Sequence, residues 1–162
     1  MCCPFFFFAV EANDSDITIR SSDNLLFRLH KQNLQCAANV FVQFIDSDTV
    51  CLSETGAVLE ILFQFIYPRP SPALEKLGFQ DLMLVAEAAE KYRLFNAMYA
   101  THFSYDRNHL TLHTKDVVRF AAKYDSPSLI SQVPLAFIMD TPLSEVVDIL
   151  PPYIYKHWVR VQ

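Results

Sequence analysis

The most reactive side chains in this 162-residue sequence belong to five histidines and four cysteines. His109 and His113 are four positions apart, a spacing that brings two imidazoles to one face of a helix, where they could bind zinc. A zinc site takes about four ligands, and no further ligand lies next to this pair. The segment around the two histidines has the composition of a turn between helices. Exposed polar histidines are therefore the simpler interpretation, and we predict no metal site.

The cysteines are placed for neither a disulfide framework nor a metal knuckle. Cys2 and Cys3 are adjacent, and no CxxC motif occurs. Disulfide scaffolds have denser and more evenly spaced cysteines, so reduced thiols and an intracellular location, in the cytoplasm or nucleus, are predicted. Cys36 and Cys51 lie in apolar periodic stretches, which favours burial as small hydrophobic side chains.

No arrangement of residues indicates catalysis or phosphate binding. A nucleophile needs a base beside it, yet Cys36 follows His30 by six residues and is off its helical face, and no GxSxG motif is present. Gly56 and Gly78 are the only glycines, which rules out GxGxxG and GxxxxGK[ST] loops. We therefore predict that the protein is not an enzyme and has no cofactor.

The composition favours a protein partner over nucleic acid or a membrane. Apolar residues make up 52% of the chain and charged residues 19%, against typical values of about 45–50% and about 25%. A net charge of −5 disfavours binding to nucleic acid. The Phe-rich start, residues 1–13, is shorter than the roughly 20 residues needed to cross a bilayer. The apolar surplus predicts a chain that hides surface against another protein.

Three short strands are predicted near the start of the chain. Residues 16–20 alternate apolar and polar side chains, as in a half-buried strand. Turn residues at 21–24 precede a second strand at 25–30, so the pair is predicted to form a hairpin. A helix at 31–39 and a third strand at 49–52 follow.

Helices dominate the rest of the chain. Thr55 is a predicted N-cap for an apolar helix over 56–67, and the proline-rich segment 68–72 ends it. Strands followed by helices in pairs indicate an α+β fold. Tyr92, Phe95, Tyr99 and Phe103 have helical spacing, which favours core packing. Further helices are predicted at 79–95, from Asn96, from Thr114, from Ser126-Pro127 and from Thr141-Pro142.

Several of these motifs, taken in order, resemble the BTB/POZ domain, most closely that of stand-alone fungal BTB proteins. They are Asp16-Ile-Thr-Ile, then Phe27-Arg-Leu-His-Lys31, then Leu59-Glu-Ile-Leu-Phe-Gln-Phe-Ile-Tyr67. The segment 82–92 is similar to the penultimate helix of that domain. One departure is the proline-rich segment 68–72, which stands where the family has a fourth strand.

The resemblance implies a BTB/POZ-like α+β fold, with a small three-stranded sheet, a cluster of helical hairpins and additional C-terminal helices. The implied domains are an N-terminal extension over 1–13, a BTB/POZ domain over 14–108 and a helical extension over 109–162. The implied function is a homodimerising protein–protein interaction module that acts as an adaptor or regulatory scaffold. The alternative is a substrate adaptor of a cullin-type ubiquitin ligase, in which helices at 114–138 extend the cullin-facing surface.

The resemblance implies that five residues contribute to a dimer interface. Asp16 and Lys31 match positions that form a charged pocket in BTB transcription regulators; the alternative is an ordinary surface pair. Leu34, Val40 and Phe41 match the first helix, which packs against its symmetry mate. No charged residue lies between Lys31 and Asp46, as expected at an interface centre. The alternative is that this stretch forms core beneath the hairpin.

Overall fold

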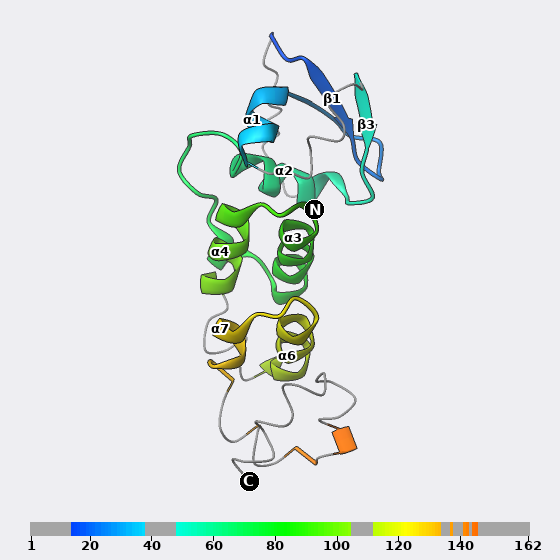
Figure 1. The fold of residues 1–162 in the computed structure, drawn as a ribbon. Coiled ribbons are helices and arrows are strands. Elements are labelled where there is room, and N and C mark those ends of the chain that lie inside the picture. Colours follow the sequence, from blue (N-terminus) through cyan, green and yellow to red (C-terminus); the bar gives the residue numbers. More distant parts are fainter. Residues whose placement is uncertain are drawn as a thin grey trace. The chain divides into compact units, whose positions relative to one another are not determined.

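The computed structural model describes residues 14–37, 48–104 and 112–133, together with positions 137, 141, 142, 144 and 145. The chain forms two compact units, Met1–Thr101 and His102–Gln162. The first unit carries the sheet and most of the described helices, and the described elements of the second unit are helices (Figure 1). The α+β class predicted from the sequence is confirmed. No helix among the described residues is long and apolar enough to cross a membrane.

The sheet has three strands in the order β2-β1-β3. Strand β1 (Ile17–Arg20) pairs antiparallel with β2 (Leu26–Leu29) and parallel with β3 (Thr49–Cys51). Ile19 is at the centre of the register, opposite Phe27 on one side and Val50 on the other. The alternation of side chains buries these three residues on one face. The three predicted strands and the predicted hairpin are confirmed.

Four α-helices and one 3-10 turn complete the described part of the first unit. The first unit ends at Thr101, and the last of these helices, α4, continues a few residues beyond it. Helix α3 ends at Tyr92 and not at the predicted residue 95, because Arg93 adopts the left-handed conformation (φ 55°) that closes the helix. Helix α2 ends before the predicted residue 67. The elements are α1 (Lys31–Ala37), α2 (Gly56–Gln64), η2 (Leu74–Lys76), α3 (Phe79–Tyr92) and α4 (Phe95–Ser104).

Helix α2 is the centre of the core in this unit. In Figure 1 it lies between the sheet and α3. Leu59, Leu62 and Phe63 on this helix are almost fully buried. The Phe63 ring meets the Phe27 ring of β2 edge-on, with centroids 5.2 Å apart. A helix with apolar residues on several faces is thus covered on more than one side, as its sequence predicts.

The start of α2 is capped by a residue other than the predicted one. Thr55 occupies the N-cap position, but its side chain makes no capping hydrogen bond. The Gly56 N–H instead donates to Asp23 Oδ1 over 2.8 Å, from the turn between β1 and β2. The Ser21 hydroxyl donates to the same oxygen, and these hydrogen bonds lower the pKa of Asp23. The hairpin turn and the α2 N-terminus are therefore joined through one carboxylate.

The second unit contains a helical pair, α6 (Thr114–Lys123) and α7 (Pro127–Ile130). Proline is at the first position of α7 and Ser126 is its N-cap residue, which confirms the predicted start. Thr114, predicted as a cap, is instead the first residue of α6 and is buried. The buried faces consist of Val117, Val118, Phe120 and Ala121 of α6 and Leu129 of α7.

Candidate functional site

The four-residue aromatic stripe predicted for the core is mostly on the surface. Tyr92 is buried at the end of α3, but Phe95, Tyr99 and Phe103 on α4 are 66%, 68% and 71% exposed. The prediction is wrong for these three because they lie on the side of α4 opposite its buried residues, while Tyr92 belongs to α3, which ends at Arg93. Ala97 and Thr101 form the buried side of α4. Helical spacing identifies a common face but not which face is covered.

The prediction that Cys36 and Cys51 are buried is also wrong, since both thiols are exposed. Cys51 is on the outward face of β3, where Val50 takes the inward position. Arg20 Nη2 donates to Cys51 Sγ over 3.1 Å. On α1 the buried residue is Leu34, two positions before Cys36.

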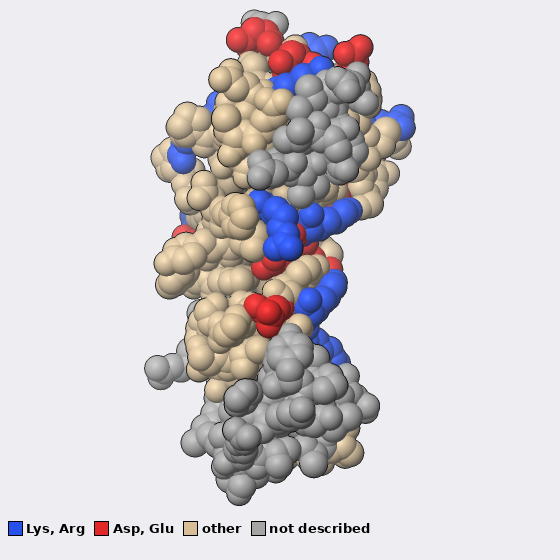
Figure 2. Space-filling view, in the orientation of Figure 1, with Lys and Arg blue, Asp and Glu red and all other residues tan. Residues whose placement is uncertain are grey.

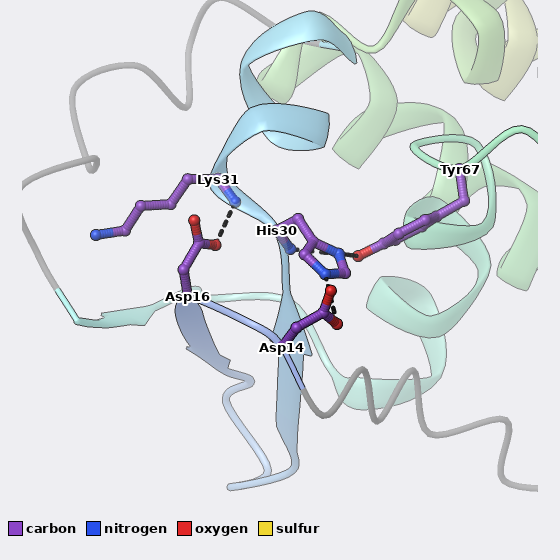
Figure 3. Close-up of polar contacts among 5 residues, drawn as sticks. All are labelled: Asp14, Asp16, His30, Lys31 and Tyr67. Atoms are coloured by element: carbon purple, nitrogen blue, oxygen red, sulfur yellow. Dashed lines mark hydrogen bonds and ion pairs between the residues drawn. The ribbon is translucent and has the colours of Figure 1, made fainter.

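A chain of hydrogen bonds runs from Asp14 through His30 to Tyr67 (Figure 3). His30 Nε2 is 3.1 Å from Asp14 Oδ1, and His30 Nδ1 is 3.1 Å from the Tyr67 hydroxyl. The same hydroxyl accepts the His30 backbone N–H over 3.3 Å. A neutral imidazole with its proton on Nε2 satisfies all three contacts, because Nδ1 then accepts the Tyr67 O–H. The hydrogen bond from His30 lowers the pKa of the exposed Asp14.

Asp16 contacts the backbone of Lys31 and not its ammonium group. Asp16 Oδ1 accepts the Lys31 N–H over 2.6 Å at the first residue of α1, which satisfies one of the free N–H groups of that helix end. Figure 3 shows the Lys31 side chain extending away from the carboxylate. Asp16 is exposed. The predicted charged pocket at a dimer interface stays a prediction.

Leu34 is only 2% exposed within the single chain, so it already contributes to the core of the first unit. This agrees with the alternative interpretation of that residue, core beneath the hairpin. Val40 and Phe41 lie outside the described residues. Their predicted place at a dimer interface, and that of Leu34, stay predictions.

A groove of about 420 Å³ lies beside Tyr67, between the segment that follows α2 and one side of α4. Its lining includes Tyr67, Arg69, Ser71, Asn96 and Tyr99. Arg69 is the one charged residue of this lining, and its guanidinium carbon is 5.6 Å from the centroid of the Tyr67 ring. Tyr67 therefore belongs to both the hydrogen-bond chain and the groove. Its hydroxyl bonds to His30, and its ring makes a cation–π contact with Arg69, the one charged residue of the groove lining.

A second polar cluster ties the loop before α2 to the end of α3. Lys91 Nζ donates to Glu54 Oε1 over 2.7 Å, and the Tyr92 hydroxyl donates to Glu54 Oε2. Burial by itself would raise the pKa of Glu54, but the hydrogen bonds from Lys91 and Tyr92 outweigh it and the pKa is lowered. Burial and the adjacent Glu54 carboxylate raise the pKa of Tyr92. Because its donors and acceptors bond to one another, this cluster has a structural role: it holds the loop before α2 against the end of α3.

The described part of the chain contains no cluster of potential metal ligands. No three His, Cys, Asp or Glu side chains come together there as ligands. His109 lies outside the described residues, and His113 is the N-cap residue of α6. Sequence reasoning missed Asp14, Tyr67 and Arg69 as site residues. His30-Lys31 and Tyr67 end two of the motifs that the sequence analysis singled out, but among them only Lys31 was given a role.

Comparison with known proteins adds no assignment: no model of a known protein family matches the sequence, and no curated protein matches it.

Proposed function

We propose that this protein is a self-associating protein–protein interaction module of the BTB/POZ kind, which acts as an adaptor or regulatory scaffold. The observation that carries the proposal is the composition and exposure of α4. This ten-residue helix contains no Asp, Glu, Lys or Arg, yet Phe95 and Tyr99 on it are exposed. In Figure 2 the surface over α4 is correspondingly mostly tan.

An uncharged aromatic surface is costly to leave in water and typical of interface centres. The centres of protein interfaces are poor in charged residues and rich in Tyr, Phe and Met, and α4 contains all three. A large aromatic side chain buries about 150–250 Å² when it is fully covered. Phe95 and Tyr99 thus offer a few hundred square ångströms of contact area beside a groove that Tyr99 itself lines.

A contact between distant segments supports the BTB/POZ part of the proposal. The motif ending in His30-Lys31 and the motif ending in Tyr67 are two of the segments that resemble that family. Their ends meet in space through the bonds from the Tyr67 hydroxyl to His30. If the two motifs resembled the family only by chance, there would be no reason for the residues at their ends to form hydrogen bonds with each other.

Two measurements test the proposal. Light scattering after size exclusion should give twice the 18.6 kDa of one chain, and Val40→Asp with Phe41→Asp should give a soluble monomer. Affinity capture from the native cell should recover partners that are lost when Phe95 and Tyr99 are both replaced by Ser. A monomeric parent at micromolar concentration, with an unchanged set of captured proteins for the α4 variant, would sink the proposal.

Leu84→Ser is the matched control for the α4 variant. Leu84 is an exposed apolar residue on a different helix, α3, so its replacement removes similar hydrophobicity from another surface. Partners that depend on α4 should survive Leu84→Ser. Loss of the same partners from both variants would indicate a general effect of surface hydrophobicity and would contradict a specific site.

The second candidate function is a substrate adaptor of a cullin-type ubiquitin ligase. The observation that favours it is the helical pair of the second unit, α6 with α7, within the stretch that this alternative assigns to the cullin-facing surface. A pull-down with a cullin N-terminal region tests it directly. Failure to bind at micromolar concentration would remove the adaptor alternative and leave the self-association proposal intact.

A further inference from the structure

The dipeptide Ser-Pro or Thr-Pro occurs three times in this chain, at Ser71, Ser126 and Thr141. The structure separates the three sites. Ser126 is 7% exposed and Thr141 is 6% exposed, and the Thr141 hydroxyl donates to the Phe137 carbonyl over 2.6 Å. Ser71 is exposed. A macromolecule that acts on a hydroxyl followed by proline could therefore reach only Ser71 without unfolding the chain.

The backbone around Ser71 is suited to such an enzyme. Residues 70–73 belong to neither helix nor strand, and residues 68–71 are all exposed. A residue before proline is pushed into an extended conformation, so Pro72 presets the backbone of Ser71. Pro68, Pro70 and Pro72 have no backbone N–H, which leaves few local hydrogen bonds to break when the segment is bound.

We propose that Ser71 is a phosphorylation site for a proline-directed protein kinase that uses ATP as the phosphoryl donor. In this step the Ser71 Oγ forms a bond to the γ-phosphorus of ATP, and the bond between that phosphorus and the β,γ-bridging oxygen breaks. ADP is the leaving group, and the hydroxyl proton passes to the kinase's catalytic base. The product is phosphoserine at residue 71.

Arg69 gives the modified residue a counter-ion. Phosphoserine has a charge of about −1.5 to −2 at neutral pH, and Ser71 and Arg69 line the same groove. No carboxylate belongs to that lining to compete for the guanidinium. A phosphate beside an arginine forms charge-assisted hydrogen bonds. Phosphorylation would thus turn a groove with one positive charge into one with a net negative charge.

Kinase treatment of the full chain tests the site. A purified proline-directed kinase and ATP should add one phosphoryl group, which tandem mass spectrometry should place on Ser71. Ser71→Ala should abolish incorporation, whereas Ser126→Ala and Thr141→Ala should leave it unchanged. Phosphate on either buried site, equal incorporation in Ser71→Ala, or no incorporation into the chain would each overturn the proposal. A synthetic peptide of residues 65–76 shows whether a negative result comes from the sequence or from the fold.

A phosphorus NMR titration tests the role of Arg69 separately. The second pKa of a phosphoserine is about 6, and an adjacent guanidinium stabilises the dianion, so this pKa should be lower in the parent than in Arg69→Gln. Arg69→Lys should lie between the two, because lysine keeps the charge but not the two-pronged geometry. Equal values in the parent and in Arg69→Gln would overturn the pairing, while the mass-spectrometric result decides the site itself.

Discussion

Replacing Gly56 by alanine should destabilise the first unit, against the usual preference for alanine in helices. Gly56 is the first residue of α2, and its backbone is not in the left-handed region. A methyl group there would lie 2.3 Å from Leu25 Cδ1, 3.0 Å from Cγ and 3.1 Å from Cβ. The obstacle is therefore steric, and it includes Leu25 Cβ, which no side-chain rotation can move.

The Leu25 backbone is held in place, and Cβ is held with it. The Leu25 carbonyl accepts the Ser21 N–H over 2.9 Å, and the Leu25 N–H donates to the Ser21 hydroxyl over 2.9 Å. Overpacking typically costs about 1–3 kcal/mol, and an anchored backbone places this site in the upper part of that range. Subtracting a helix-propensity gain of up to about 1 kcal/mol leaves a loss of about 1–2 kcal/mol.

Urea unfolding of four proteins measures this effect: the parent, Gly56→Ala, Leu25→Ala and the double variant. A loss of about 1–2 kcal/mol also lowers Tm by about 2–8 °C in a chain of this length. In the Leu25→Ala background, Gly56→Ala should instead be neutral or stabilising, because the obstructing atoms are gone. A coupling energy of about 2–3 kcal/mol is then expected. A neutral or stabilising Gly56→Ala in the parent background would refute the reasoning.

Three further predictions concern the polar contacts. Asp16→Ala should cost about 1 kcal/mol of unfolding free energy because the Lys31 N–H loses its acceptor. Asp16→Asn should cost almost nothing, since an amide oxygen caps equally well. Equal losses in the two variants would show that the charge of Asp16 matters, as the charged-pocket prediction requires. Tyr67→Phe should cost about 1 kcal/mol in chemical denaturation, because the hydroxyl that bonds His30 is gone, and an unchanged midpoint would contradict that contact. The lowered pKa of Glu54 means that the folded state holds this proton less tightly than the unfolded state. Its contribution to stability is therefore complete above the usual value of 4.5 and is lost as the pH falls through the lowered pKa. Relative to the parent, Glu54→Gln should lose stability at neutral pH and show a shallower decline in acid, as measured by unfolding at a series of pH values.

Local patterns in the sequence predicted the elements well. Alternation at Ile17 and Ile19 placed β1, and the Ser126-Pro127 pair placed the start of α7. These features depend on neighbours within a few residues, since period-two burial and proline at a first helical position are local properties. The α+β class followed from the order of such segments alone.

Which side of an element is covered, and by what, was decided only by the tertiary structure. Helical spacing put Phe95 and Tyr99 on one face of α4, but their exposure depends on where the chain turns after Arg93. Likewise Thr55 is at the expected capping position, while the bond comes from Asp23, more than thirty residues earlier. A backbone N–H donates to any well-placed acceptor, however distant along the chain.

For the candidate site too, the sequence showed the residue types and only the structure showed their contacts. The residue types of His30 and Tyr67 were visible as the ends of two motifs, but their hydrogen bond spans 37 positions. All three Ser/Thr-Pro pairs are visible in the sequence, but only the structure shows that Ser71 is exposed while Ser126 and Thr141 are buried. The sequence by itself thus determined the elements and the chemistry available to this protein. Contact between distant segments determined which of those groups meet and which face solvent, because burial is a property of the packed chain and not of any segment within it.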